Sequence, residues 1–425
     1  MSTPQNPPPA TSTESASAVP ADLQDERLIA AEGIGGWLSS TWDRIKSGDL
    51  GSLPVVVGLV IIWGVFYALN PAFLSSRNLV NLVLQMVPVG TIALGIVLVL
   101  LLGEIDLSVG SMSGLSGAVL AVMFVNNGLP VWLAVATALG VGVLTGLVYG
   151  ALYNRFGVPS FVISLAGLLM LLGLQLTVLG TDGTINIPFE SGLVRFASQL
   201  FLPVWLAYAL AVAIPAGYLV SRFRTSQRRS AAGLSAPPLS ALAIRSGLLA
   251  ALLIVAVAVL NRDRGVSYMV LLFFVLVVLV DLAIRRTTWG RSVLAIGGNV
   301  EAARRAGINV KRVYLSVFAL CSTFAALGGI LAAARLASAN QSSGGADTNL
   351  NAIAAAVIGG TSLFGGRGSA YSALLGILVI WSISNGLALL SVSANVRYIV
   401  TGAVLLLAVV IDSLSRRSRA AHGRA

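Results

Sequence analysis

The stretch from Leu101 to Met123, LLGEIDLSVGSMSGLSGAVLAVM, joins two apolar runs through a short polar and glycine-rich break. Asp106 and Ser108 can accept hydrogen bonds from the free backbone N–H groups at the start of the second run. Gly103 and Gly110 permit a break followed by close helix packing. Because buried backbone groups in lipid must all be hydrogen-bonded, this pattern predicts a broken helix inside a membrane.

The acidic pair in this break, Glu104 and Asp106, admits two interpretations. It either caps the second helix beside a small-residue packing face, or it belongs to a broken helix that lines or gates a substrate path. A second glycine-rich break, IGGTSLFGGRGSAYSALLGILVI from Ile358, has a similar shape and indicates either an ancient duplication or chance similarity. Its candidate gating positions are Gly359, Gly360, Gly365 and Gly366.

Composition supports a membrane protein throughout. The chain is 56% hydrophobic and 10% charged, against about 25% charged in soluble domains, and its mean hydropathy is +0.90. We expect an all-α polytopic membrane protein of about twelve transmembrane helices, some of them broken or re-entrant, with cytoplasmic N- and C-termini. The apolar runs lie at 54–70, 79–102, 107–125, 131–152, 161–179, 203–221, 247–260, 266–284, 313–334, 350–363, 370–390 and 397–412, and those at 247–260 and 350–363 are short for a full span.

Charge sets the predicted orientation. Twelve spans with both ends inside leave six of the 27 Lys and Arg residues outside, namely Arg77, Arg195, Arg262, Arg264, Arg335 and Arg397. Such a bias follows the positive-inside rule and accounts for the net charge of +11 without nucleic-acid binding. Residues 1–50, rich in Pro, Ser, Thr and Ala, predict a disordered cytoplasmic arm, and residues 413–425 predict a basic cytoplasmic tail.

Several kinds of chemistry are disfavoured by what the sequence lacks. The only cysteine, Cys321, lies in an apolar run, and the only histidine, His422, lies in the tail, so we expect no metal site. Neither lysine, Lys46 or Lys311, stands in a phosphate-binding glycine loop, so we expect no catalytic residue and no ATPase site on this chain. An ion-coupled transporter would need buried acids, and Glu104 and Asp106 are placed by the predicted topology at the cytoplasmic side.

The polar stretch 298–312, GNVEAARRAGINVKR, is predicted to lie in the cytoplasm. GGN supplies a turn with Asn299 as N-cap, EAARRA favours a short helix with Glu301 in its first turn, and Gly307 ends it in a left-handed conformation. The stretch is either a docking segment for a soluble partner or a solvated loop that only orients the chain.

Four motifs in the same order carry a family resemblance: GEIDLSVGS, AIGGNVEAARRAGINVKR, NAIAAAVIGGTSLFGGRGS and YIVTGAVLLLAVVIDS. Together they resemble the permease subunits of bacterial ABC importers for monosaccharides, of the ribose and xylose type, over residues 54–412. The region 203–260 resembles the xylose branch, which has an additional helical pair there. The resemblance implies a transmembrane permease domain at 54–412 with a cytoplasmic coupling loop at 286–312.

The resemblance also implies function and partners. The chain would move a monosaccharide, xylose or a related pentose, across the bacterial plasma membrane. It would act as a homodimer in membrane lipid. Its other partners would be a cytoplasmic ABC ATPase and an extracytoplasmic sugar-binding protein. The chain itself would hold no cofactor, since ATP–Mg would bind the partner ATPase. The positions that match the family's ATPase-coupling loop are Gly298, Asn299, Glu301, Ala302, Ala303 and Gly307.

Three polar or aromatic residues within the apolar runs are candidates for the sugar path. Gln85, Trp381 and Asn385 offer the amide hydrogen bonds and the aromatic face that a pentose needs. Each can equally be a helix-packing group, because Asn and Gln also form hydrogen bonds between membrane helices.

Overall fold

The structure is a computed structural model that describes residues 53–234, 236 and 239–421. The arm predicted at residues 1–50 and the last four residues of the tail therefore lie outside the described residues. The principal helices are α2 (Leu53–Leu69), α3 (Ser76–Leu101), α4 (Val109–Ala121), α5 (Val131–Phe156), α6 (Ser160–Leu179), α7 (Gly192–Val194), α8 (Val204–Ala231), α9 (Leu239–Leu260), α10 (Tyr268–Arg286), α11 (Thr288–Gly298), α12 (Val300–Arg305), α13 (Val310–Leu336), α14 (Ala346–Ile358), α15 (Ala370–Leu389) and α16 (Ala394–Ala421).

Short irregular elements join these helices. The 3-10 turns are η2 (Pro71–Leu74) and η4 (Gly180–Asp182), and the π-helical turns are η3 (Val122–Asn126) and η5 (Arg195–Gln199). Two three-residue strands, β1 (Thr184–Asn186) and β2 (Ser338–Asn340), pair antiparallel with Ile185 opposite Ala339. The fold is thus all-α apart from this one small strand pair among the described residues.

Each expected apolar run contains a helix, but the number of full spans is smaller than twelve. Among the described residues, nine helices are long and apolar enough to cross a membrane. α2 has 17 residues and α14 only 13, which at 1.5 Å per residue makes α14 about 20 Å long, against about 30 Å of hydrocarbon core. α14 is therefore too short to cross a bilayer as a helix by itself.

Two other boundaries differ from the sequence prediction. The run at 247–260 is not short, because α9 begins at Leu239 and has 22 residues. The first two turns of α9 contain Ser and Arg residues, so the helix begins before the apolar run from which it was predicted. Likewise α16 continues through residues 413–421 of the predicted tail, where no Gly or Pro interrupts the helix before Gly423.

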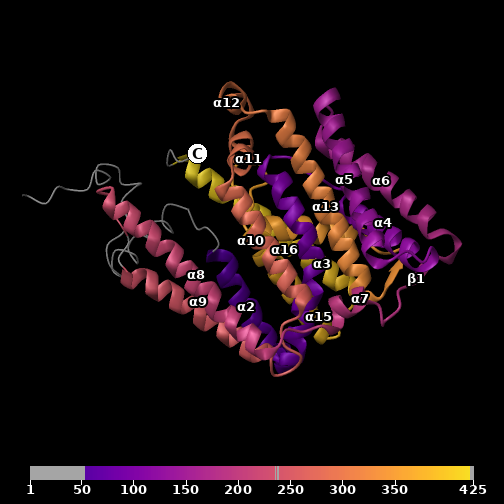
Figure 1. The fold of residues 1–425 in the computed structure, drawn as a ribbon, viewed down its shortest axis with the longest axis horizontal. Coiled ribbons are helices and arrows are strands. Elements are labelled where there is room, and N and C mark those ends of the chain that lie inside the picture. The colour runs from indigo at the N-terminus through magenta and orange to yellow at the C-terminus, as the bar shows by residue number, and fades with distance from the viewer. Residues whose placement is uncertain (1–52, 235, 237–238, 422–425) are drawn as a thin grey trace, which may run out of the picture. The chain divides into compact units, whose positions relative to one another are not determined.

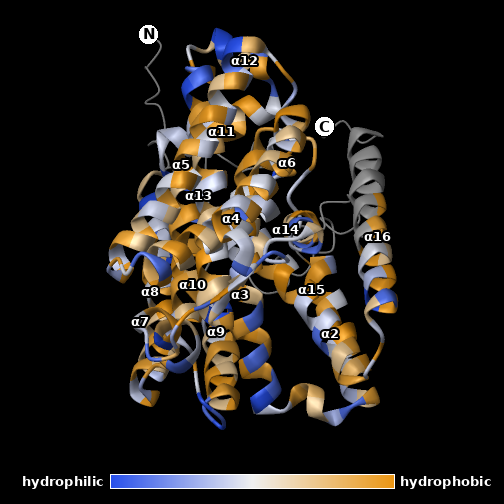
Figure 2. Ribbon diagram, turned by 90° about the vertical axis from the view of Figure 1, so that its right-hand side faces the viewer, coloured by the Kyte–Doolittle hydropathy of each residue, from blue (hydrophilic) through white to orange (hydrophobic). Residues whose placement is uncertain are grey.

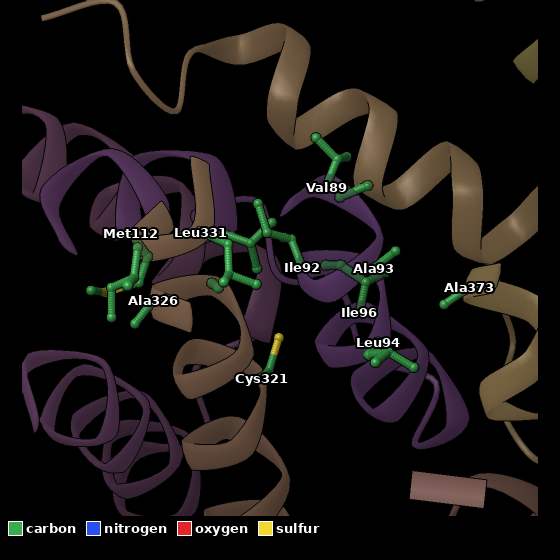
Figure 3. Packing of buried hydrophobic residues seen from close by; sticks show 14 of the residues in the cluster. Val89, Ile92, Ala93, Leu94, Ile96, Met112, Cys321, Ala326, Leu331 and Ala373 are labelled. Carbon is green, nitrogen blue, oxygen red and sulfur yellow. The ribbon is translucent and has the colours of Figure 1, made fainter. Parts of the chain in front are cut away.

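α3 is the central helix of the core. It is buried on all sides from Leu82 to Leu101 apart from a few half-buried positions, as a helix that is apolar all round should be. α13 packs directly against it: a Cβ on Gly95 would lie 2.8 Å from the Cys321 carbonyl oxygen. Figure 3 shows Ile92 and Ile96 of α3 close to the α13 residues Cys321 and Leu331. Small residues thus let the two backbones approach, as expected for membrane helices.

The bundle formed by residues 53–207 and 256–421 has two distinct ends. α11 and α12 lie at one, called here the α12 end, and β1 and α7 lie at the opposite one (Figure 1). Hydrophilic residues gather on α12, whereas the helices between the ends are largely apolar (Figure 2). α5 carries exposed apolar side chains such as Leu144 and Leu147, which suit contact with lipid chains.

Residues 208–255 form a compact unit of their own. They contain most of α8 and α9, in the region where the sequence predicts an additional helical pair. The Ser246 hydroxyl donates a 2.8 Å hydrogen bond to the Pro215 carbonyl. This contact links the two helices within the unit.

Candidate coupling and translocation site

The predicted coupling loop contains two helices, α11 and α12, joined at Asn299. Asn299 is extended, with φ −162°, and its side-chain oxygen accepts a 2.9 Å hydrogen bond from the Ala302 N–H. Glu301 lies in the first turn of α12, and Gly307 follows its end with φ +83°. The N-cap, the short helix and the left-handed glycine are therefore confirmed. The predicted GGN turn is wrong in one respect, because Gly297 and Gly298 are the last residues of α11.

α12 presents most of its residues outward. Glu301, Ala302 and Arg304 are exposed, whereas Ala303 is buried against the bundle with 4% of its surface accessible. Ala303 was predicted as a coupling-loop position and this stays a prediction, but its side chain packs against its own protein. Gly298, Asn299 and Gly307 are exposed, so five of the six predicted coupling positions are accessible at the α12 end.

The break after α3 is held by its first acid, Glu104. Gly103 has φ +80°, which turns the chain sharply out of α3. The Tyr153 hydroxyl then donates a 2.6 Å hydrogen bond to Glu104 Oε1, and the Tyr153 ring stacks on Tyr314 with centroids 4.5 Å apart. Glu104 thereby fixes the break to α5, and through the ring stack to α13.

The second acid, Asp106, is fully buried. Its Oδ1 accepts hydrogen bonds from the N–H (2.8 Å) and the hydroxyl (2.7 Å) of Ser108, and its Oδ2 lies 3.7 Å from Cys321 Sγ. Ser108 is the N-cap residue of α4 and makes no side-chain cap, and Asp106 holds its N–H and hydroxyl just before the helix. Cys321 lies about 16 Å along α13 from Val310. Asp106 is therefore buried inside the bundle, and its place at the cytoplasmic side stays a prediction.

The second glycine-rich break joins α14 to α15 and lies beside the first. The Gly366 N–H donates a 2.9 Å hydrogen bond to the carbonyl of Leu101, the last residue of α3. Gly360, Gly365 and Gly366 all have positive φ, and a Cβ on Gly359 would lie 1.8 Å from the Ser372 carbonyl oxygen in α15. The structure thus brings together two breaks that the sequence placed far apart.

The three sugar-path candidates lie on two neighbouring helices, α3 and α15. Asn385 exchanges two amide hydrogen bonds with Asn78, at 2.8 and 3.1 Å, so it makes the interhelical contact that the sequence left open as the alternative. Gln85 lies two helical turns after Asn78 on α3, and Trp381 lies one turn before Asn385 on α15. Both are half-buried. A role for the three residues in sugar passage stays a prediction.

A buried polar group that the sequence reasoning missed is Gln175 in α6. It is 0% exposed, and its Nε2 donates 3.0 Å hydrogen bonds to the carbonyls of Asn340, the last residue of β2, and Ser343, in the loop before α14. Among the described residues, its Oε1 has no hydrogen-bond partner, and neither has Oδ1 of the buried Asn349 in α14. A lone glutamine inside the apolar run 161–179 was the signal that could have found this site.

The glycines of α4 make room for this polar loop. A Cβ on Gly114 would lie 2.3 Å from both Gln175 Oε1 and the Ser343 carbonyl oxygen. A Cβ on Gly110 would lie 2.9 Å from the Gly344 carbonyl oxygen. Gly110, predicted as part of a helix break, therefore serves close packing between α4 and the loop that precedes α14.

Comparisons with known proteins agree on one family. The profile described as "Branched-chain amino acid transport system / permease component" matches residues 78–409. The chain is 37% identical over 380 residues to the xylose transport system permease protein of Escherichia coli (strain K12), covering 89% of this chain and 96% of that protein. The corresponding xylose permease of Haemophilus influenzae is 36% identical, with coverage of 88% and 99%.

A ribose import permease is also similar. The protein from Escherichia coli (strain K12) is 31% identical over 358 residues, which cover 84% of this chain and 92% of that protein. No solved structure matches the chain significantly. The described residues contain nine apolar helices long enough to cross a bilayer, and the chain is a multi-pass protein of the bacterial plasma membrane, as the sequence predicts. The chain belongs to the permease component family of ABC-type importers.

Proposed function

We propose that the chain is the transmembrane subunit of an ABC importer that carries a monosaccharide, xylose or a related pentose, into the cytoplasm. The observation that carries this proposal is the likeness to xylose permeases over 89% of the chain, together with an exposed capped helix, α12, at one end of the bundle. The energy comes from ATP–Mg bound and hydrolysed by a separate ATPase subunit.

The proposed orientation places the α12 end in the cytoplasm, with both chain termini on that side. The basic residues in α12 and shortly after it then follow the positive-inside rule; they are Arg304, Arg305, Lys311 and Arg312. Glu301, Ala302 and Gly307 would contact the ATPase, since their positions are exposed there. The opposite end, with β1 and β2, would receive sugar from an extracytoplasmic binding protein.

The remaining partners follow from the same family likeness. A second copy of the chain completes the transport unit, and lipid chains contact the apolar outer faces of helices such as α5 and α6. In this arrangement the partner's ATP-driven closure moves α12, and the movement opens and closes the path through the bundle.

A second candidate function is ion-coupled sugar transport. Asp106 favours it, because a fully buried carboxyl inside a membrane bundle is the group that a coupling proton would need. Its hydrogen bonds to Ser108 also suit a purely structural role at the start of α4, and the family likeness supports the importer instead.

Uptake of labelled xylose by cells with and without this chain tests the proposal. We expect uptake to depend on the chain, to compete with unlabelled xylose more strongly than with ribose or leucine, and to persist under a protonophore while cellular ATP is held constant. Loss of uptake under the protonophore at constant ATP would favour ion coupling. Preferential competition by leucine would assign the substrate to branched-chain amino acids.

A further inference from the structure

Three segments that are distant in sequence meet at the α12 end of the bundle. They are the end of α3 with Gly103 after it, the end of α11 at Gly297, and the loop between α14 and α15 at Gly365 and Gly366. The hydrogen bond from the Gly366 N–H to the Leu101 carbonyl, at 2.9 Å, joins the first segment to the third. We call this meeting point the glycine joint.

Gly297 lies at the centre of this joint, against the backbone of both other segments. A Cβ at position 297 would lie 1.7 Å from the Leu101 carbonyl oxygen and 2.6 Å from the Gly366 nitrogen. Gly297 has ordinary helical geometry, so the need for glycine here comes from space alone and not from an unusual φ. α11 therefore contacts both helix breaks with its bare backbone.

Gly365 completes the same contact from the other side. Its φ is +86°, and a Cβ there would lie 2.7 Å from the Gly297 carbonyl oxygen and 2.9 Å from the Gly103 nitrogen. One backbone segment thus touches α11 and the break after α3 together. By contrast, a Cβ on Gly298, the next residue of α11, would meet nothing within 4 Å. The crowding is confined to the face of α11 that looks into the bundle.

Contacts between bare backbones transmit displacement differently from contacts between side chains. A long side chain can change rotamer and absorb a movement of about 1 Å, whereas packed backbone has no such freedom. A shift of α11 must therefore move the end of α3 and the loop before α15 with it.

We infer that Gly297 is a positioning residue. It couples α11 and α12, which form the predicted coupling loop, to both helix breaks through the glycine joint. The inference rests on the proposed importer function and adds to it the route by which movement of α11 and α12 reaches the sugar path. Gly103, Gly365 and Gly366, expected from the sequence to act as gating positions, would act here as the receiving side of the joint.

The first test is Gly297→Ala in the complete transporter. We expect ATPase association and basal ATP hydrolysis to persist, because the exposed surface of α12 is unchanged, and xylose uptake to fall by about 5- to 150-fold, the range of typical coupling energies. The matched control is Gly140→Ala, an exposed helical glycine of α5 whose added Cβ would meet nothing within 4 Å. Uptake by Gly297→Ala equal to that of Gly140→Ala would overturn the inference.

A second measurement decides the matter if Gly297→Ala fails to fold. Spin labels at Arg291→Cys in α11 and Phe364→Cys in the loop before α15 occupy exposed positions, and the native Cys321 is buried. We expect the same distance distribution between them with and without ATP in the full complex, since the joint moves as one body. A distance that changes with nucleotide would overturn the inference. Failure of the unlabelled chain to bind any ATPase would instead contradict the proposed function.

Discussion

Tyr153 and Glu104 are joined by a 2.6 Å hydrogen bond that holds the break after α3 against α5. The Tyr153 ring also stacks on Tyr314, so this residue of α5 contacts both the break and α13. The bond lies at the boundary between the break and α5, where both partners are half-buried. It is therefore positioned to fix the geometry of the break in one state.

Tyr153→Phe should remove this hydrogen bond and keep the ring stack. We expect a loss of about 1.5 kcal/mol of stability, at the low end for bonds to charged groups because the pair is half-buried. Thermal unfolding of the purified protein in mild detergent measures the loss. Tyr67→Phe is the control, since Tyr67 is half exposed on α2. Equal unfolding midpoints for the two variants would show that the bond contributes nothing.

Asp106 should be needed as a hydrogen-bond acceptor. Asp106→Ala leaves the Ser108 N–H and hydroxyl without their partner inside the bundle, at an expected cost of about 1–3 kcal/mol. Asp106→Asn retains an acceptor oxygen and should cost clearly less. Unfolding midpoints of the two variants provide the measurement. If Asn and Ala destabilise equally, and a protonophore stops uptake by the native chain but not by Asp106→Asn, Asp106 acts through its ionisation instead.

The Asn78–Asn385 pair should act as one unit in stability. A double-mutant cycle with Asn78→Ala and Asn385→Ala should give a coupling free energy of about 0.6 kcal/mol, the average for hydrogen bonds between membrane helices. Additive effects of the two substitutions would contradict the packing role. In that case Asn385 would return as a candidate for direct sugar contact.

Gln85 and Trp381 should affect uptake more than stability if they line the sugar path. Gln85→Ala and Trp381→Ala are each expected to lower xylose uptake while leaving ATPase association and the unfolding midpoint of the complex near those of the native chain. Competition with ribose should also shift, since these side chains would contact sugar hydroxyls and ring faces. Uptake that falls only in proportion to lost stability would assign both residues to helix packing.

The sequence predicted local features well, because short-range rules decide them. Asn299 caps α12 and Gly307 follows it in a left-handed conformation, and each depends only on residues a few positions away. Gly297 could not be predicted in the same way. Its requirement for glycine comes from Leu101 and Gly366, which approach it only in the folded bundle.

Burial of individual residues was also beyond the sequence. Ala303 matches the family's coupling loop, yet it faces its own bundle, because which side of so short a helix is covered depends on tertiary packing. The burial of Asp106 depends on tertiary packing in the same way. The break leaves α3 at one end of the bundle and then re-enters it, so its place between two apolar runs did not reveal how deep it lies.

The central claim is that a separate ATPase powers this chain, and co-purification from the native membrane tests it most directly. Glu301 is exposed, and its 2.6 Å ion pair with Arg304 is a surface pair that adds little to stability, so Glu301→Arg should fold and insert normally. Glu190→Arg, an exposed acid outside the coupling segment, is the matched control. We predict a stoichiometric P-loop ATPase with the native chain and with Glu190→Arg, and its loss with Glu301→Arg. A folded native chain that consistently retains no ATPase would contradict the account.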